Sequence, residues 1–185
     1  MLDTNLLIDF LLIQWKEDIG QRIPPHLLRS HELKRHFVAQ HFNHYASEWN
    51  KLEFRDVVQK LIEERKLIQH GYGLHEFSEG RKELPLSREE LDRINMIVEK
   101  TFRGAVPAMS EIDLPLVHSV SERGFSAFDA LLLLQAGQTP SCTHFVTRDR
   151  YILDNFHSRL SRLLPGLRVL NPKQALFLLS RQRQA

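Results

Sequence analysis

The sequence predicts an α/β protein, a three-layer α/β/α arrangement with a central, mostly parallel sheet. Short apolar segments typical of buried strands alternate along the chain with longer segments of helical periodicity. Parallel strands joined through helices are covered on both faces, with right-handed crossovers. The 185 residues, 42% of them hydrophobic, suit one domain with a good core. We therefore expect a single domain over 1–185, with an insertion around 70–86.

Composition favours a cytoplasmic protein that does not enter the membrane. The single Cys142 excludes an intramolecular disulfide framework and fits a reducing compartment. The apolar stretch from Leu6 to Trp15 is too short to cross a bilayer and contains Asp9. The chain also begins without the basic residues of a signal peptide. Lys and Arg outnumber Asp and Glu over 145–185, which suits either a bound polyanion or an ordinary solvated surface.

The first nine residues predict a short strand, a tight turn and a helix that continues to Gly20. Asp3, Thr4 and Asn5 hydrogen-bond local backbone readily, so they suit a strand end that is also a helix N-terminus. Such a position directs a carboxylate out of the carboxyl edge of a sheet, where open α/β folds bind ligands. Taken alone, Asp3 is better explained as a simple N-cap.

The next segments predict a short helix over His26–His36 after the Pro24–Pro25 break, then a second strand over His36–Phe42. A long helix follows from Asn43 to about Gln69. Residues 70–83 are polar and contain three glycines, which predicts a loop or small hairpin.

Capping patterns define the helices that follow. Ser87 and Glu90 form a capping box that opens a helix to Phe102. Glu111 and Asp113 suit the N-terminus of a helix that ends at Gly124. Ser126 then caps an apolar helix whose first turn contains Asp129.

The C-terminal part predicts two further strand–helix units. The strand from His144 ends in Thr147-Arg148-Asp149 and passes into a helix to Leu164. A last strand, Leu167–Leu170, precedes a helix over Pro172–Arg181, with Pro172 near its first position.

Three acids therefore follow strand ends or begin apolar helices, namely Asp3, Asp129 and Asp149. A carboxylate beside several leucines is costly to bury unless a positive charge receives it. Oxygen ligands without thiolates select Mg²⁺ or Mn²⁺, which also accept phosphate oxygens. One or two such ions can activate water and stabilise the charge that develops during phosphodiester hydrolysis.

At these residues the chain resembles the PIN-domain nucleases, which include the toxins of Vap toxin–antitoxin systems. The matching segments are Leu-Asp-Thr-Asn-Leu-Leu-Ile-Asp at the start, Phe-Asp-Ala-Leu-Leu-Leu in the middle and Phe-Val-Thr-Arg-Asp near the end. The resemblance covers both ends of the chain well and the middle poorly. It implies an RNA endonuclease that works as a homodimer, often with a cognate antitoxin.

The resemblance also implies a fourth acid, in the helix after the second strand. Glu48, nearer the helix start, is preferred over Glu53. Asn5 and Thr147 suit hydrogen bonds that hold the carboxylates in place. Arg148 and Arg150 suit contacts with substrate phosphates, or equally pairs with surface acids.

Two alternatives remain open on the sequence alone. One is a degenerate PIN-like module that binds RNA or a protein without cleaving. The other is a zinc-dependent hydrolase, because His41, His44 and Glu48 would share one face of a helix that began early enough.

Overall fold

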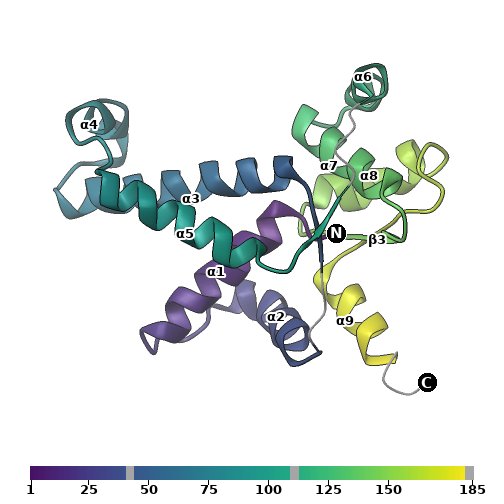
Figure 1. Cartoon of the computed structure of the whole chain (residues 1–185), viewed down its shortest axis with the longest axis horizontal. Coiled ribbons are helices and arrows are strands. Elements are labelled where there is room, and N and C mark those ends of the chain that lie inside the picture. Colours follow the sequence, from purple (N-terminus) through teal and green to yellow (C-terminus); the bar gives the residue numbers. More distant parts are fainter. Residues whose placement is uncertain (41–43, 109–112, 182–185) are drawn as a thin grey trace. The chain divides into compact units, whose positions relative to one another are not determined.

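The computed structural model describes residues 1–40, 44–108 and 113–181 (Figure 1). The predicted fold class is wrong. The described chain is mostly helical, and its strands form two separate two-stranded parallel sheets, with no central sheet between helical layers. None of the described helices is both long enough and apolar enough to span a membrane.

Helices make up most of the described chain, and the strands between them are short. The helices are α1 (Thr4–Asp18), α2 (Leu28–Gln40), α3 (Glu48–Gln69), α4 (Phe77–Glu83), α5 (Arg88–Phe102), α6 (Leu114–Glu122), α7 (Ala127–Gln138), α8 (Arg150–Leu160) and α9 (Pro172–Arg181), with short 3-10 turns η1 (Pro25–Leu27) and η2 (Leu74–Glu76). The strands are β1 (Tyr45–Ala46), β2 (Val106–Pro107), β3 (His144–Val146) and β4 (Arg168–Leu170).

The strands are too short to build a central sheet. β1 pairs with β2 and β3 with β4, in both cases over two or three residues, against about five or six in a typical strand. Leu2 adds one isolated parallel bridge to Val146. The predicted strand over His36–Phe42 is also wrong as far as Gln40, because α2 continues to that residue; residues 41–43 lie outside the described part. Apolar periodicity alone does not distinguish a buried strand from a buried helix. In this chain the longer apolar segments form helices.

The chain divides into two compact units, the first of which contains Met1–Asn50 and the described residues from Gly104 onward. Its main core surrounds α7, where Leu132 and Leu133 are almost fully buried with Phe145 of β3 and Ile152 of α8. Burying each such side chain contributes about 1.5–3 kcal/mol. Elsewhere in this unit α2 packs against both α1 and α9.

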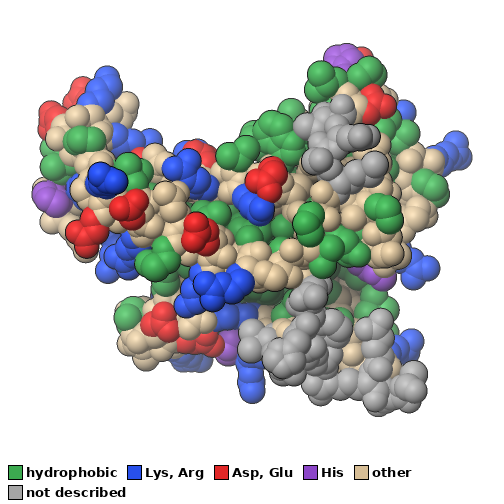
Figure 2. Space-filling view, viewed as in Figure 1, with side chains coloured by type: hydrophobic (Ala, Val, Ile, Leu, Met, Phe, Trp, Pro, Cys, Tyr) green, Lys and Arg blue, Asp and Glu red, His purple; other side chains and the backbone are tan. Residues whose placement is uncertain are grey.

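The second unit, Lys51–Arg103, is a helical hairpin of α3 and α5 with α4 between them in sequence (Figure 1). Phe54 and Phe102 meet edge to face with ring centroids 5.4 Å apart, and Lys66 Nζ lies 2.8 Å from Glu90 Oε2. Its surface mixes charges of both signs, as Figure 2 shows over α3 to α5.

The predicted loop over 70–83 is wrong, because η2 and α4 occupy most of it. Gly80 misled the prediction, since glycine usually signals a loop. In the structure it lies inside α4, where a Cβ would come within 2.6 Å of Leu67 Cδ2 and 2.9 Å of Tyr72 Cδ1. Its role is close packing of α4 against the end of α3.

Several helix boundaries confirm the capping predictions. Ser87 Oγ accepts from the Glu90 amide, and Glu90 Oε2 accepts from the Ser87 amide. Asp113 caps α6 and Ser126 caps α7, while Glu111 lies outside the described residues. Gly124 follows α6 with φ +94°, and an added Cβ there would collide with the Tyr151 hydroxyl.

Candidate functional site

Asp3 and Thr147 leave adjacent parallel chain segments at the same end. The Asp3 amide donates to the Val146 carbonyl at 2.9 Å, and the Val146 amide donates to the Met1 carbonyl at 3.0 Å. The Thr147 amide in turn donates to the Leu170 carbonyl, also at 3.0 Å, so the β4 end lies alongside. A few backbone hydrogen bonds thus create a local carboxyl edge without a large sheet.

The carboxylate of Asp3 is buried, with 3% of the residue exposed, and it does not cap the helix that Asp3 begins. Its Oδ2 instead accepts from Thr147 Oγ1 at 2.6 Å and from Asn5 Nδ2 at 3.3 Å. The simple N-cap explanation of Asp3 therefore does not describe its hydrogen bonds.

Thr147 links two of the predicted acids. Its fully buried hydroxyl donates to Asp3 and accepts from the Asp149 amide at 2.9 Å. The Asp149 carboxylate caps α8, where Oδ1 accepts from the amides of Tyr151 at 2.7 Å and Ile152 at 3.2 Å. Within the described part of the chain, Asp149 Oδ2 accepts no hydrogen bond, and the residue is half-buried. One carboxylate oxygen beside a helix N-terminus is thus left for solvent or a bound group.

Asp129 occupies the first turn of α7, half-buried. Its amide donates to Ser126 Oγ at 3.1 Å, and Ser126 Oγ donates back to Asp129 Oδ2 at 2.6 Å. The preceding residue, Phe128, meets Trp49 edge to face with ring centroids 6.3 Å apart. This contact brings the start of α7 next to the start of α3.

Glu48 is the exposed first residue of α3, beside Trp49. Asn50 lies one residue beyond Trp49, and its Nδ2 donates to Thr4 Oγ1 at 3.1 Å, which ties the start of α3 to the start of α1. Glu48 belongs to the same compact unit as the three aspartates, whereas Glu53 belongs to the hairpin unit.

Sequence reasoning missed Asn50, which is fully buried. Within the described residues its Oδ1 has no hydrogen-bond partner, although buried acceptors are normally satisfied. An amide oxygen beside Thr4 is a hard oxygen ligand of the kind that Mg²⁺ takes, and it can also accept a hydrogen bond from a metal-bound water. No local pattern would have identified it, because its burial depends on the packing of the α3 start against α1.

Sequence reasoning also missed Asp9, whose side chain is only 2% exposed. It accepts from Ser30 Oγ of α2 and lies 2.8 Å from Arg148 Nε. Burial raises the pKa of Asp9, while the Ser30 hydrogen bond and the positive charges of Arg148 and His26 lower it. An acid inside the apolar run of α1 was the signal that a buried partner exists.

The two arginines predicted to contact substrate therefore differ. Arg148 forms an ion pair with Asp9, although 37% of the Arg148 side chain remains exposed. Arg150 is exposed and forms no ion pair within the described residues.

Among the described residues, no three His, Cys, Asp or Glu side chains form a ready-made metal site. The helical face on which the zinc alternative depends is absent, because α2 ends at Gln40, His44 precedes β1 and α3 begins at Glu48. His41 lies outside the described part. Burial, helped by the positive charge of the chain's amino group, lowers the pKa of His44 to about 4.

Comparison of the chain with protein-family models, with curated proteins and with solved structures gave no match. The function of the chain is therefore inferred from its own residues.

Proposed function

We propose that this chain is a Mg²⁺- or Mn²⁺-dependent endoribonuclease that hydrolyses RNA phosphodiester bonds. The proposal combines the motif resemblance to PIN-domain nucleases with the local geometry of the acids. Asp3, Glu48, Asp129 and Asp149 are its carboxylates, with Asn5 and Thr147 as their hydrogen-bonding supports.

The observation that supports the proposal best is the position of Thr147. One buried hydroxyl holds the Asp3 carboxylate and receives the Asp149 amide, so the first and last motifs of the chain meet at two strand ends. A purely structural cap would not need a buried carboxylate that makes no hydrogen bond to the amides of its own helix. Carboxylates that lie close together repel one another until a cation neutralises them.

The donor set fits a hard divalent cation. Asp3 and Asp149 would hold it, and we propose Glu48 and Asp129, at the starts of α3 and α7, as its further carboxylates. When bound, the cation supplies an activated water and neutralises charge on the phosphate. The chain's own part is to orient these oxygens, and exposed Arg150, the residue directly after Asp149, is available to contact a neighbouring phosphate.

The test is cleavage of a mixed RNA pool with Mg²⁺, Mn²⁺ or EDTA. Wild type is compared with Asp3→Asn, Asp129→Asn and Asp149→Asn, each of which keeps the side-chain shape and removes the charge. Asp154→Asn is the matched control, because Asp154 is an exposed acid on the helix that Asp149 caps. We expect metal-dependent cleavage in wild type and Asp154→Asn, and a loss of about 100-fold or more in the other three.

A further pair separates the candidates for the fourth acid. Glu48→Gln should reduce cleavage strongly, and Glu53→Gln should leave it near wild type. Cleavage that survives all three aspartate substitutions would refute the proposed site. Binding of RNA without cleavage by pure wild type would favour the non-catalytic module.

The resemblance extends the proposal to partners. We propose a homodimer and, if the enzyme is the toxin of a toxin–antitoxin pair, an antitoxin that covers the acids. Measurement of the molecular mass in solution tests the homodimer. Co-expression with small proteins encoded next to this chain tests the antitoxin.

A further inference from the structure

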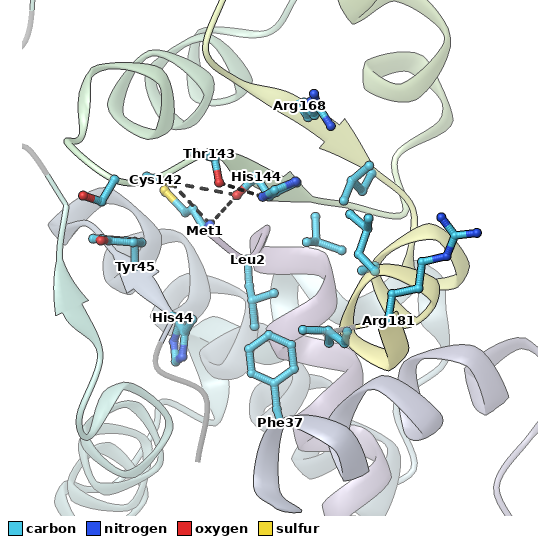
Figure 3. A pocket seen from close by; sticks show the side chains of 16 residues that line it. Met1, Leu2, Phe37, His44, Tyr45, Cys142, Thr143, His144, Arg168 and Arg181 are labelled. Atoms are coloured by element: carbon cyan, nitrogen blue, oxygen red, sulfur yellow. Dashed lines mark hydrogen bonds between the residues drawn. The ribbon is translucent and has the colours of Figure 1, made fainter. Parts of the chain in front are cut away.

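A cavity of about 500 Å³ lies in the first unit, apart from the acids (Figure 3). It lies along β3 and β4, where His144 and Arg168 are register partners. Asp3, Thr147 and Asp149 do not line it, although Leu2 and Val146, the residues before Asp3 and Thr147, do. Its size is that of a small-molecule site, for which about 300–1,000 Å³ is usual.

The walls of the cavity are mainly apolar. Leu2, Phe37, Leu170 and the α9 residues Leu178 and Leu179 contribute hydrocarbon or aromatic surface. Leucines 178 and 179 are only half-buried, so part of this surface is open to a ligand. A hydrocarbon or aromatic body would gain free energy by covering it.

The polar groups of the lining are neutral or positive. Among the described residues that line the cavity, none is Asp or Glu, while Arg168, Arg181, His44 and His144 all contribute. Arg168 is exposed, and it forms no ion pair with any carboxylate in the described part of the chain. Burial and the charge of Arg168 lower the pKa of neighbouring His144, whose Nδ1 lies 2.8 Å from Thr143 Oγ1.

Ser141, at the cavity margin, is the one non-glycine residue of the described chain with positive φ, at 65°. Such backbone strain concentrates at ligand-binding and switch regions.

We propose that this cavity binds a small amphipathic anion, a carboxylate on a hydrocarbon body, with the carboxylate at Arg168 and the body against α9. Because the described lining contains arginines and no acid, a cation is excluded as the natural occupant. The open, apolar wall favours an anion that also carries a hydrocarbon body over a small inorganic anion. This site is independent of the proposed nuclease reaction.

The probes are hexanoate, octanoate and decanoate, titrated calorimetrically into the full-length protein below their micelle concentrations. We expect one site per chain and affinity that rises about fourfold per added methylene. Acetate tests the anion without the body. Decyltrimethylammonium tests the body with the opposite charge, and neither should bind measurably.

Two variants locate the site. Arg168→Gln should weaken decanoate binding about tenfold, the value of one charge-assisted hydrogen bond. Leu178→Trp should abolish it by placing an indole where the hydrocarbon body would lie against α9. Arg162→Gln is the matched control, because Arg162 is exposed and outside the lining. Circular dichroism confirms that each variant is folded.

The histidine ring resonances in NMR spectra provide a second readout, because His44 and His144 line the cavity. Both should shift with decanoate in wild type and not in Leu178→Trp. Equal binding of decanoate and decyltrimethylammonium, or decanoate binding that neither variant weakens, would refute the proposal. Absence of saturable decanoate binding would also refute the proposal, whether or not the chain self-associates.

Discussion

The ion pair between buried Asp9 and partly exposed Arg148 should respond asymmetrically to loss of its two members. Removing one partner of a buried ion pair costs about 3–5 kcal/mol when the other charge remains uncompensated. In Arg148→Ala the remaining charge is on Asp9, which is 2% exposed and retains the Ser30 hydroxyl. In Asp9→Asn the remaining charge is on Arg148, which is 37% exposed and reaches water.

We therefore expect Arg148→Ala to lower the free energy of unfolding by about 2–4 kcal/mol at pH 7. Asp9→Asn should lower it by no more than about 1 kcal/mol, because the amide still accepts from Ser30 and the cost of burying a carboxylate disappears. The double variant should resemble Asp9→Asn. Arg150→Ala is the control, because Arg150 is exposed and near in sequence.

The assay is urea denaturation followed by circular dichroism. Burial raises the pKa of Asp9, so the folded state holds its proton more tightly than the unfolded state. Stability from this group is therefore gained as pH falls through the folded pKa and lost as pH rises through it. Loss of the arginine charge raises the pKa of Asp9 further. The loss of unfolding free energy caused by Arg148→Ala should therefore become smaller at lower pH. Equal losses in the two single variants, or a larger loss in Asp9→Asn, would refute this reasoning.

Two further predictions concern Asp149 and His44. Asp149→Ala should lower the free energy of unfolding by about 1 kcal/mol and Asp149→Asn by much less, because Asn also caps helices well. Thermal denaturation checks this, and equal losses would show that the cap is not the stabilising feature. In histidine ring NMR spectra, the pKa of His44 should be about 4 and not 6.5. Its imidazole is then neutral over most of the pH range in which the chain is folded. As pH falls from 6.5 to about 4, the unfolded chain binds this proton more readily and stability decreases, with no further loss below. An observed midpoint near 6.5 would contradict the burial of this ring.

Local hydrogen-bonding signals in the sequence predicted several elements correctly. The Ser87–Glu90 box, the Ser126 cap and the Gly124 terminus all lie where short-range chemistry places them. The strands around Phe145 and Val169 were also predicted within a residue or two. The caps depend on residues that are three or four positions apart, so no distant partner is needed to specify them.

The fold class failed for the opposite reason. A sheet exists only where distant segments pair, and one sequence does not show how many residues each ladder contains. The prediction extended short strands into a central sheet, whereas the pairs are two or three residues long. Likewise, Gly80 predicted a loop by its type, although its surroundings make it a packing residue of α4.

The sequence by itself determined the caps and the two C-terminal strand–helix units, and it supplied the candidate acids. Only the tertiary structure decided that Thr147 joins Asp3 to Asp149, that Asp9 receives Arg148, and that Asn50 is buried beside Thr4. The physical reason is that such contacts connect residues far apart in the chain. Their free energy depends on burial and on the direction of each side chain, which packing creates and no local pattern contains.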